Sequence, residues 1–291
     1  MAINLWQGPG SSTTTSNWGT GTNWSTGSAC VSTDTAILTN SNVDINAGLS
    51  VSAVVLNEFR TYMDYAANVG TITDYLNVGG SLFNIGFPSI NVVGNGSRRM
   101  NINAATSSAV FNIYGTGSTA ADPAMTPVRL LGTSLVVNCF GGISGAALLE
   151  SETASIATLN ILQNATMIYG DGVTATTSKV YAGNLNSYSK NTHTAVTVDG
   201  NGVFNKYGVG AITALTIGSN AKSTYFSGTV ATLNLTGTID FGGATVTLTN
   251  TNLYRGARLL NGENVTFTNP FALINCGLKD VTIDLGIGRG A

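Results

Sequence analysis

The side chains that carry most enzyme chemistry are scarce in this chain and form no catalytic pattern. Charged residues make up 9% of the sequence, with 14 acidic residues and one histidine, His193. Two carboxylates can act as acid and base on a glycosidic bond. However, Glu150 and Glu152 lie in a predicted turn or short helix, and Asp280 and Asp284 flank one strand on the same face. We interpret them as turn and surface residues, because Asp is favoured in turns.

Patterns for other catalytic or metal-binding sites are also missing. No Gly-x-Ser-x-Gly elbow accompanies His193, which lies in a polar stretch and is predicted to face solvent. Cys30, Cys139 and Cys276 are odd in number and far apart, which predicts buried free thiols rather than disulfides or a zinc site. Residues 199–202 lack the acidic ligand that completes a calcium loop. We therefore predict no enzyme, no cofactor and no metal site.

The composition predicts a folded β protein. Of the 291 residues 43% are hydrophobic and 36 are Gly, the mean hydropathy is +0.21, and the helix formers Glu and Lys are rare. A net charge of −2, with no basic cluster larger than Arg98–Arg99, argues against a nucleic-acid partner. No apolar run approaches the roughly 20 residues of a membrane helix. The first residues lack a charged and then apolar segment, so we expect a chain without a signal peptide, made in the cytoplasm.

Short alternations of apolar residues with Thr or Asn recur along the chain and predict strands with one apolar face. In the second half they return at intervals of roughly 13 to 20 residues, which is typical of stacked coils. We predict an all-β fold, mainly a β-solenoid (β-helix) over residues 49–291, with residues 1–48 as an irregular Trp-rich arm and cap. An antiparallel β-sandwich or jelly roll is the alternative, because Asp-Gly and Asn-Gly pairs at 171–172, 199–202 and 261–262 are typical of hairpins. The only candidate helix is 146–152.

Aromatic side chains are the best candidates for binding. Trp6, Trp18 and Trp24 lie in the arm among Gly, Ser, Thr and Asn, so they either cap the first coil or dock on a partner. Four tyrosines that are close in sequence are either ordinary strand residues or a stacking platform for sugars: Tyr169, Tyr181, Tyr188 and Tyr207. Arg98 and Arg99 form a solvated pair or contact a partner.

Several segments carry a family resemblance. Residues 18–28 (WGTGTNWSTGS) and 32–38 (STDTAIL) resemble the first strand region of β-helical proteins in the virions of tailed bacteriophages. They are also similar to parts of bacterial autotransporter passengers, and residues 94–103 and 128–132 extend the likeness to phage structural proteins. The resemblance implies a homotrimeric virion component on the capsid or the tail. The missing signal peptide favours the phage alternative.

From the resemblance and the lack of catalytic patterns we expect a non-enzymatic virion structural protein. The role expected first is capsid decoration, in which a cement protein stabilises the head through contacts with the major capsid protein. The alternative is a tail spike or fibre segment that binds, and in one variant cleaves, host surface glycan. A surface adhesin is a third possibility, which would need an export route.

Overall fold

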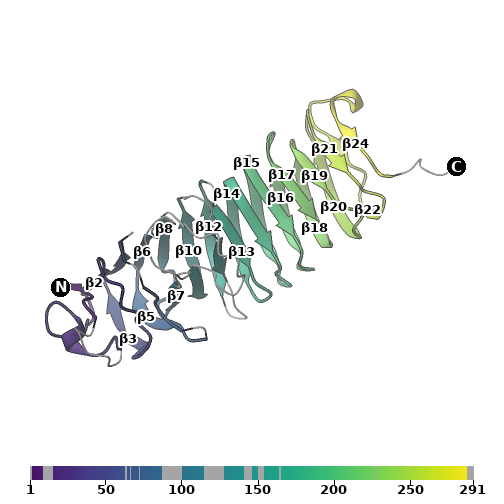
Figure 1. Cartoon of the computed structure of the whole chain (residues 1–291). Helices are drawn as coiled ribbons and strands as arrows, with labels where there is room; N and C mark the ends of the chain where they lie inside the picture. Colours follow the sequence, from purple (N-terminus) through teal and green to yellow (C-terminus); the bar gives the residue numbers. More distant parts are fainter. Residues whose placement is uncertain are drawn as a thin grey trace. The chain divides into compact units, whose positions relative to one another are not determined.

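The structure is a computed structural model of the whole chain. It describes residues 2–8, 16–62, 64–65, 67–71, 73–86, 100–114, 128–140, 146–149, 154–163, 165–225 and 227–286, with only the backbone of 146–149 and Tyr225. The chain divides into two compact units, Met1–Ser155 (unit 1) and Ile156–Ala291 (unit 2). Both are all-β, and strands far apart in the sequence lie side by side in parallel ladders (Figure 1).

Unit 1 is built from two ladders that alternate along the chain. The first ladder contains β1 (Ile3–Leu5), β2 (Thr35–Leu38), β4 (Glu58–Thr61), β6 (Leu82–Gly86), β8 (Val110–Tyr114) and β10 (Leu135–Cys139). The second contains β3 (Ser50–Leu56), β5 (Leu76–Gly80), β7 (Met100–Ala104), β9 (Val128–Gly132) and β11 (Ala146–Leu149). The chain therefore makes one strand of each ladder per coil, which is a β-solenoid.

The interior of unit 1 is an aromatic stack. Phe59, Phe83 and Phe111 occupy equivalent positions of β4, β6 and β8 and have no exposed surface. The Phe83 and Phe111 rings are parallel, with centroids 4.5 Å apart. Because identical positions of successive coils face the same way, one aromatic residue per coil produces a continuous buried column.

The three tryptophans close the first end of this column. Trp18 stacks on Phe59 at 6.2 Å, and Trp24 meets both Trp18 and Trp6 edge to face at 4.7 and 5.2 Å. All three side chains are at most 2% exposed. The same segment covers the outer edge of β1, because Leu5 donates its N–H to Ser25 Oγ and accepts from Ser25 N. The three indole rings are therefore packed within their own chain at this end of the column, and their docking on a partner stays a prediction.

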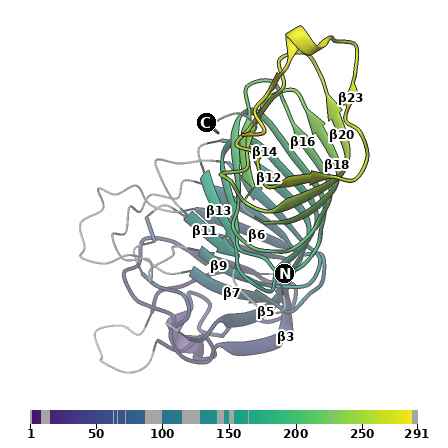
Figure 2. The same ribbon diagram turned by 90° about the vertical axis from the view of Figure 1, so that its right-hand side faces the viewer.

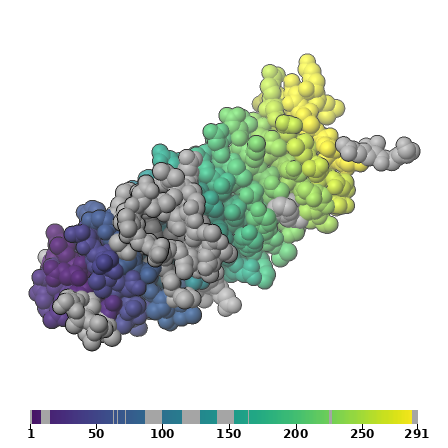
Figure 3. Space-filling model, in the orientation of Figure 1, coloured from purple at the N-terminus to yellow at the C-terminus, as the bar shows by residue number. Residues whose placement is uncertain are grey.

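Unit 2 has shorter and more regular coils. Its strands are β12 (Ser155–Ile161), β13 (Ala165–Tyr169), β14 (Thr174–Ser187), β15 (His193–Lys206), β16 (Ile212–Ile217), β17 (Lys222–Tyr225), β18 (Gly228–Leu235), β19 (Thr238–Asp240), β20 (Val246–Leu253), β21 (Arg258–Leu260), β22 (Val265–Phe267), β23 (Ala272–Leu273) and β24 (Thr282–Ile283). Successive coils follow one another along each face (Figure 2). Each coil contributes its own band of surface in turn (Figure 3).

The coil lengths can be read from hydrogen bonds between equivalent asparagines. In unit 1, Asn112 bonds to Asn84 and Asn138 to Asn112, with separations of 28 and 26 residues. In unit 2, Asn205 bonds to Asn186 and Asn252 to Asn234, with separations of 19 and 18 residues. The β-solenoid prediction is confirmed, and so is the interval expected for the second half.

Three local predictions are wrong. The strand registers are parallel throughout the described ladders, which contradicts the antiparallel sandwich. The Asp199–Gly200 pair makes no hairpin, because β15 runs through it with a bulge opposite Tyr181 and Gly200 takes up a φ of +55°. Residues 146–149 of the predicted helix form β11, since pairing with β9 overrides helix propensity.

The structure also bears on two further sequence expectations. The first ladder begins with β1 and β2, so strands of the solenoid already lie within residues 1–48. The only helices in the described ranges are the three-residue 3-10 turns η1 (Gly21–Asn23) and η2 (Leu278–Asp280). Neither is long enough to cross a membrane.

Candidate functional site

The candidate site is a groove on the outer face of the first ladder of unit 1. It has a volume of about 710 Å³ and lies where β4, β6 and β8 end. Its walls combine two tyrosines with charged and hydroxyl side chains: Thr39, Arg60, Thr61, Tyr62, Asp64, Asn84, Gly86 and Tyr114. A volume between about 300 and 1,000 Å³ is ordinary for a small-molecule site.

The ladder register brings the aromatic walls together. Thr61 is paired with Ile85, and Gly86 with Tyr114, so Tyr62, Gly86 and Tyr114 follow one another on successive coils. Tyr62 is 43% exposed and Tyr114 is 39% exposed. On its other side, the Tyr114 ring is stacked on Phe140, with centroids 4.8 Å apart and an interplanar angle of 8°. Each tyrosine therefore offers part of its surface to a ligand.

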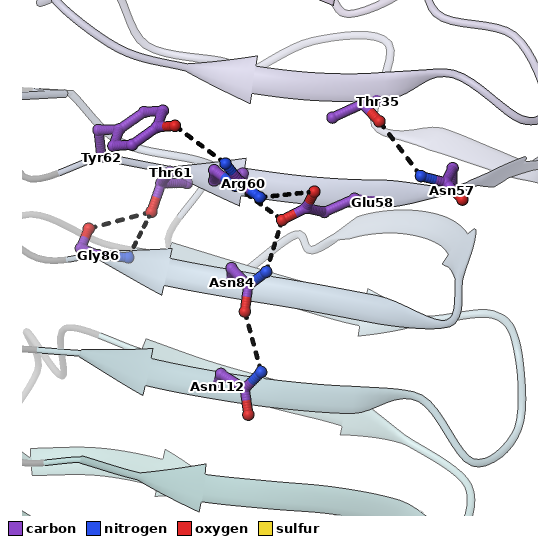
Figure 4. A network of polar contacts seen from close by, with 9 residues as sticks. All are labelled: Thr35, Asn57, Glu58, Arg60, Thr61, Tyr62, Asn84, Gly86 and Asn112. Carbon is purple, nitrogen blue, oxygen red and sulfur yellow. Dashed lines mark hydrogen bonds and ion pairs between the residues drawn. The ribbon is translucent and has the colours of Figure 1, made fainter. Parts of the chain in front are cut away.

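A chain of hydrogen-bonded polar side chains runs across β4, β6 and β8 (Figure 4), and three of its members line the groove: Arg60, Tyr62 and Asn84. Glu58 accepts from Arg60 Nε at 2.7 Å and from Arg60 Nη2 at 2.9 Å, and Asn84 Nδ2 donates to the same carboxylate at 2.5 Å. Arg60 Nη1 also donates to the Tyr62 hydroxyl at 3.0 Å. The chain continues outward from Asn84 to Asn112 at 2.9 Å.

The bonds to Glu58 also bear on the charge of Arg60. Hydrogen bonding to Glu58 raises the pKa of the Arg60 guanidinium, so the cation is permanent. Both carboxylate oxygens of Glu58 already accept bonds, and the side chain is largely buried. Glu58 therefore holds Arg60 in place and is badly placed to donate a proton to a ligand, as a general acid must.

The side chain of Asp64 differs from that of Glu58. Both of its oxygens accept from Thr39 Oγ1 at 2.9 Å, and Asp64 is exposed at the rim of the groove. Ionised carboxylates are pure acceptors with room for several donors. Asp64 can therefore accept further hydrogen bonds from hydroxyl groups of a ligand, next to two aromatic surfaces.

Comparison of the chain with protein-family models, with curated proteins and with solved structures gives no match. The site is therefore interpreted from its own geometry.

The predicted tyrosine platform is only partly assembled. Tyr188 and Tyr207 are 45% and 42% exposed and stack on each other with centroids 4.8 Å apart, and Tyr181 is 41% exposed. Tyr169, in contrast, has no exposed surface and its hydroxyl is hydrogen-bonded to Ser178 at 2.8 Å. Tyr169 is therefore an ordinary strand residue, the first of the two alternatives, because its position in β13 faces inward. A role of Tyr181 and Tyr188 in glycan contact stays a prediction.

The prediction that His193 faces solvent is wrong. The imidazole has no exposed surface, stacks on Tyr169 at 5.3 Å and bonds through Nε2 to Ser187 Oγ at 3.1 Å. Burial, reinforced by the charge of Lys206, lowers its pKa to about 4. A Ser–His pair suggests nucleophilic catalysis, but both side chains are fully buried and Nδ1 has no partner among the described residues to orient it. The pair is a packing feature.

Lys206 is also fully buried, although lysine is almost never found in a core without a partner. Its ammonium donates to the carbonyl oxygens of Ser189 and Gly208. Desolvation lowers its pKa to about 8. Lys206 and His193 therefore form a polar layer inside unit 2 that sequence periodicity does not predict.

The remaining predicted residues contribute no site. Arg98, Arg99, Glu150 and Glu152 lie outside the described residues. Cys30 and Cys139 are buried as predicted, and burial raises the pKa of each thiol to about 12, whereas Cys276 is only half-buried. Within the described ranges no three His, Cys, Asp or Glu side chains are grouped as metal ligands would be.

The groove itself was missed by sequence reasoning, although a signal exists. The segments Phe83-Asn84-Ile85-Gly86 and Phe111-Asn112-Ile113-Tyr114 repeat one motif. Aligning them places Gly86 beside Tyr114, as the register does.

Proposed function

We propose that this protein is a non-enzymatic structural protein of a tailed-phage virion, and that its groove recognises a glycan of the host surface. The virion assignment rests on the resemblance of residues 18–28 and 32–38 to β-helical phage proteins. The binding role rests on one observation: two exposed tyrosines stand on successive sides of Gly86, next to Arg60 and Asp64. Sugar rings present C–H faces to aromatic rings and hydroxyl groups to carboxylates, so both surfaces of the groove have a use.

Between the two roles expected from the sequence, the geometry favours glycan recognition over capsid decoration. The three tryptophans that were expected to cap the first coil or to dock on a partner are buried in their own chain, whereas the groove is open. Binding without cleavage is favoured because Glu58 already accepts three hydrogen bonds within the protein, two from Arg60 and one from Asn84. A general acid needs a carboxyl group that can be protonated and can reach the ligand.

A glycan array probed with the purified chain tests this proposal. We expect binding to a subset of bacterial surface polysaccharides and a loss of at least about tenfold on Tyr62→Ala or Tyr114→Ala, equivalent to about 1.4 kcal/mol. The matched comparison is Tyr188→Ala at the other exposed tyrosine pair, where we expect no loss. A loss confined to Tyr188→Ala would move the site to unit 2. Failure of the wild-type chain to bind any polysaccharide would refute glycan recognition.

Capsid decoration is kept as a second candidate because of the C-terminal coil, residues 263–286. None of its described residues is buried, and it exposes apolar side chains such as Leu278, at 67%. An open apolar layer suits contacts with the major capsid protein or with other copies in a trimer. Antibody labelling of particles under the electron microscope distinguishes the roles: label over the head supports decoration, and label at the tail tip supports glycan recognition.

A further inference from the structure

An aromatic column on the outside of unit 1 lacks a side chain at one coil. Tyr62, Gly86, Tyr114 and Phe140 follow one another on successive coils of the first ladder, as the registers of β4, β6 and β8 and the bond from Phe140 N to Ile113 O show. Where the column is complete, Tyr114 and Phe140 stack face to face at 4.8 Å. At Gly86 there is no side chain, and the groove opens at this position.

The width of the gap follows from the spacing of strands. Neighbouring parallel strands lie about 4.8 Å apart, so Tyr62 and Tyr114 belong to strands about 9.6 Å apart. A saturated six-membered ring placed midway stands about 4.8 Å from either side, which is the centroid distance already seen between Tyr114 and Phe140. At this spacing, one ring fits in the gap between the two side chains.

The charges around the gap restrict the ring further. Arg60 is neutralised by the bidentate contact with Glu58, at 2.7 and 2.9 Å. Asp64 accepts only from the Thr39 hydroxyl, and the described residues contain no ion pair to it. Within the described part of the rim, Asp64 therefore has no cation paired with it, so it repels carboxylate or phosphate groups and accepts hydrogen bonds from hydroxyl groups.

From these observations we propose that the gap above Gly86 holds a single uncharged pyranose ring of the glycan, sandwiched between Tyr62 and Tyr114, with adjacent hydroxyl groups bonded to Asp64. This inference rests on the proposed function and adds the sugar class and the residue that creates the subsite. Gly86 determines specificity by what it lacks: any larger side chain would occupy the ligand's place in the column.

Completing the column is the sharpest test. Gly86→Phe places a third ring between Tyr62 and Tyr114. Thr61 Oγ1 bonds to both N and O of Gly86 at 3.0 Å and holds that backbone in place. We expect an unchanged or higher melting temperature and a loss of glycan binding of at least about tenfold. Binding that survives in a folded Gly86→Phe variant would overturn the sandwich while leaving glycan recognition intact.

A second variant covers the case in which Gly86→Phe fails to fold. Tyr114→Phe keeps the ring and its stack on Phe140 and is expected to keep binding within about threefold, whereas Tyr114→Ala removes one wall and is expected to lose at least about tenfold. Equal losses in both variants would show that the hydroxyl group, and not the ring face, contacts the ligand, and would overturn the sandwich.

The charge preference is tested with paired ligands. Wild-type protein is titrated with a neutral hexose oligosaccharide selected on the array and with its uronic-acid counterpart. We expect the neutral sugar to bind at least about tenfold more tightly, and Asp64→Asn to shrink this preference. The control is Asp171→Asn in unit 2, an exposed carboxylate bonded to Lys190 at 2.6 Å, which should leave the preference unchanged. Equal binding of both sugars by the wild type would overturn the inference, whereas no binding of any sugar would refute the proposed function itself.

Discussion

The two units stack parallel coils in different ways. Unit 1 uses coils of 26 and 28 residues along its asparagine ladder and has a column of large aromatic rings within an otherwise aliphatic interior. Unit 2 uses coils of 18 and 19 residues and buries mainly aliphatic side chains, together with the polar layer of His193 and Lys206. Both bond outward asparagines from coil to coil at 2.8 to 2.9 Å.

The difference shows where a solenoid can acquire function. A short, regular coil has few residues that are free of the ladder, so its sequence is largely dictated by packing. The longer coils of unit 1 carry extra residues between strands, and the groove lies where β4, β6 and β8 give way to these connections. The strands supply Arg60, Gly86 and Tyr114, whereas Tyr62 and Asp64 come from the connection that follows β4.

The aromatic interior of unit 1 gives the largest expected effect. Phe83 is fully buried between Phe59, at 5.9 Å, and Phe111, at 4.5 Å. Phe83→Ala should lower the free energy of unfolding by about 3–5 kcal/mol, because it leaves a cavity and removes the ring that Phe59 and Phe111 contact. The measurement is urea denaturation followed by tryptophan fluorescence, which reports on unit 1 because all three tryptophans lie there.

The control for this variant is Phe83→Leu, which keeps most of the volume and should cost less than about 1.5 kcal/mol. If Phe83→Ala has the same urea midpoint as the wild type, the aromatic column does not stabilise unit 1. The two units would then differ in their core side chains without a difference in stability.

Much of the fold could be predicted because packing imposes a visible period. Alternation of apolar residues with Thr and Asn marked strands such as β16, β18 and β20. The Asp199–Gly200 signal failed because a Gly at positive φ serves a bulge as well as a hairpin, and only the long-range register distinguishes them. The helix prediction for residues 146–152 failed for a similar reason. Residues 146–149 are helix formers by composition, but their long-range pairing with β9 makes them a strand.

The site was far less predictable. Tyr62, Gly86 and Tyr114 are separated by coils of unequal length, so no fixed period links them. His193 lies in a polar stretch of sequence yet is fully buried, because β15 begins there and its first side chain faces inward. Composition identifies which residue types are present, but only the register of the coils shows which of them meet.

The buried polar layer of unit 2 gives the second prediction. Lys206 has a pKa of about 8 in the folded protein, below its ordinary value of 10.5. The unfolded chain therefore binds more protons between these values, and the contribution of Lys206 to stability should rise with pH in that window. From about pH 7.5 to about pH 9.5 we expect the wild type to gain on the order of 2 kcal/mol relative to Lys206→Met, measured as the difference between their urea midpoints at each pH.

Lys206→Met keeps the length of the side chain and removes the charge, so it lacks this gain. Burial raises the pKa of the Cys30 and Cys139 thiols, and their ionisation in the unfolded chain lowers the stability of both proteins alike as pH rises. Lys190→Met is the control, because the exposed Lys190 has a pKa raised by its bond to Asp171 and gains nothing from deprotonation. If the stability of Lys206→Met still rises with pH as that of the wild type does, another group causes the rise. The polar layer would then not affect the free energy of unfolding.

The asparagine ladders give the smallest expected effect and the closest comparison between the units. Asn112 both donates to Asn84 and accepts from Asn138, each at 2.9 Å, whereas Asn252 donates to Asn234 alone and its own position is paired with Ala272. Asn112→Ala should cost about 1–2 kcal/mol and Asn252→Ala about 0.5–1 kcal/mol, since a net hydrogen bond contributes about 1 kcal/mol. Urea denaturation followed by circular dichroism measures both. Both ladders face outward, and the two substitutions differ mainly in the number of hydrogen bonds lost. Equal losses of stability would therefore mean that water replaces these bonds. The ladders would then set the register of the coils without stabilising them.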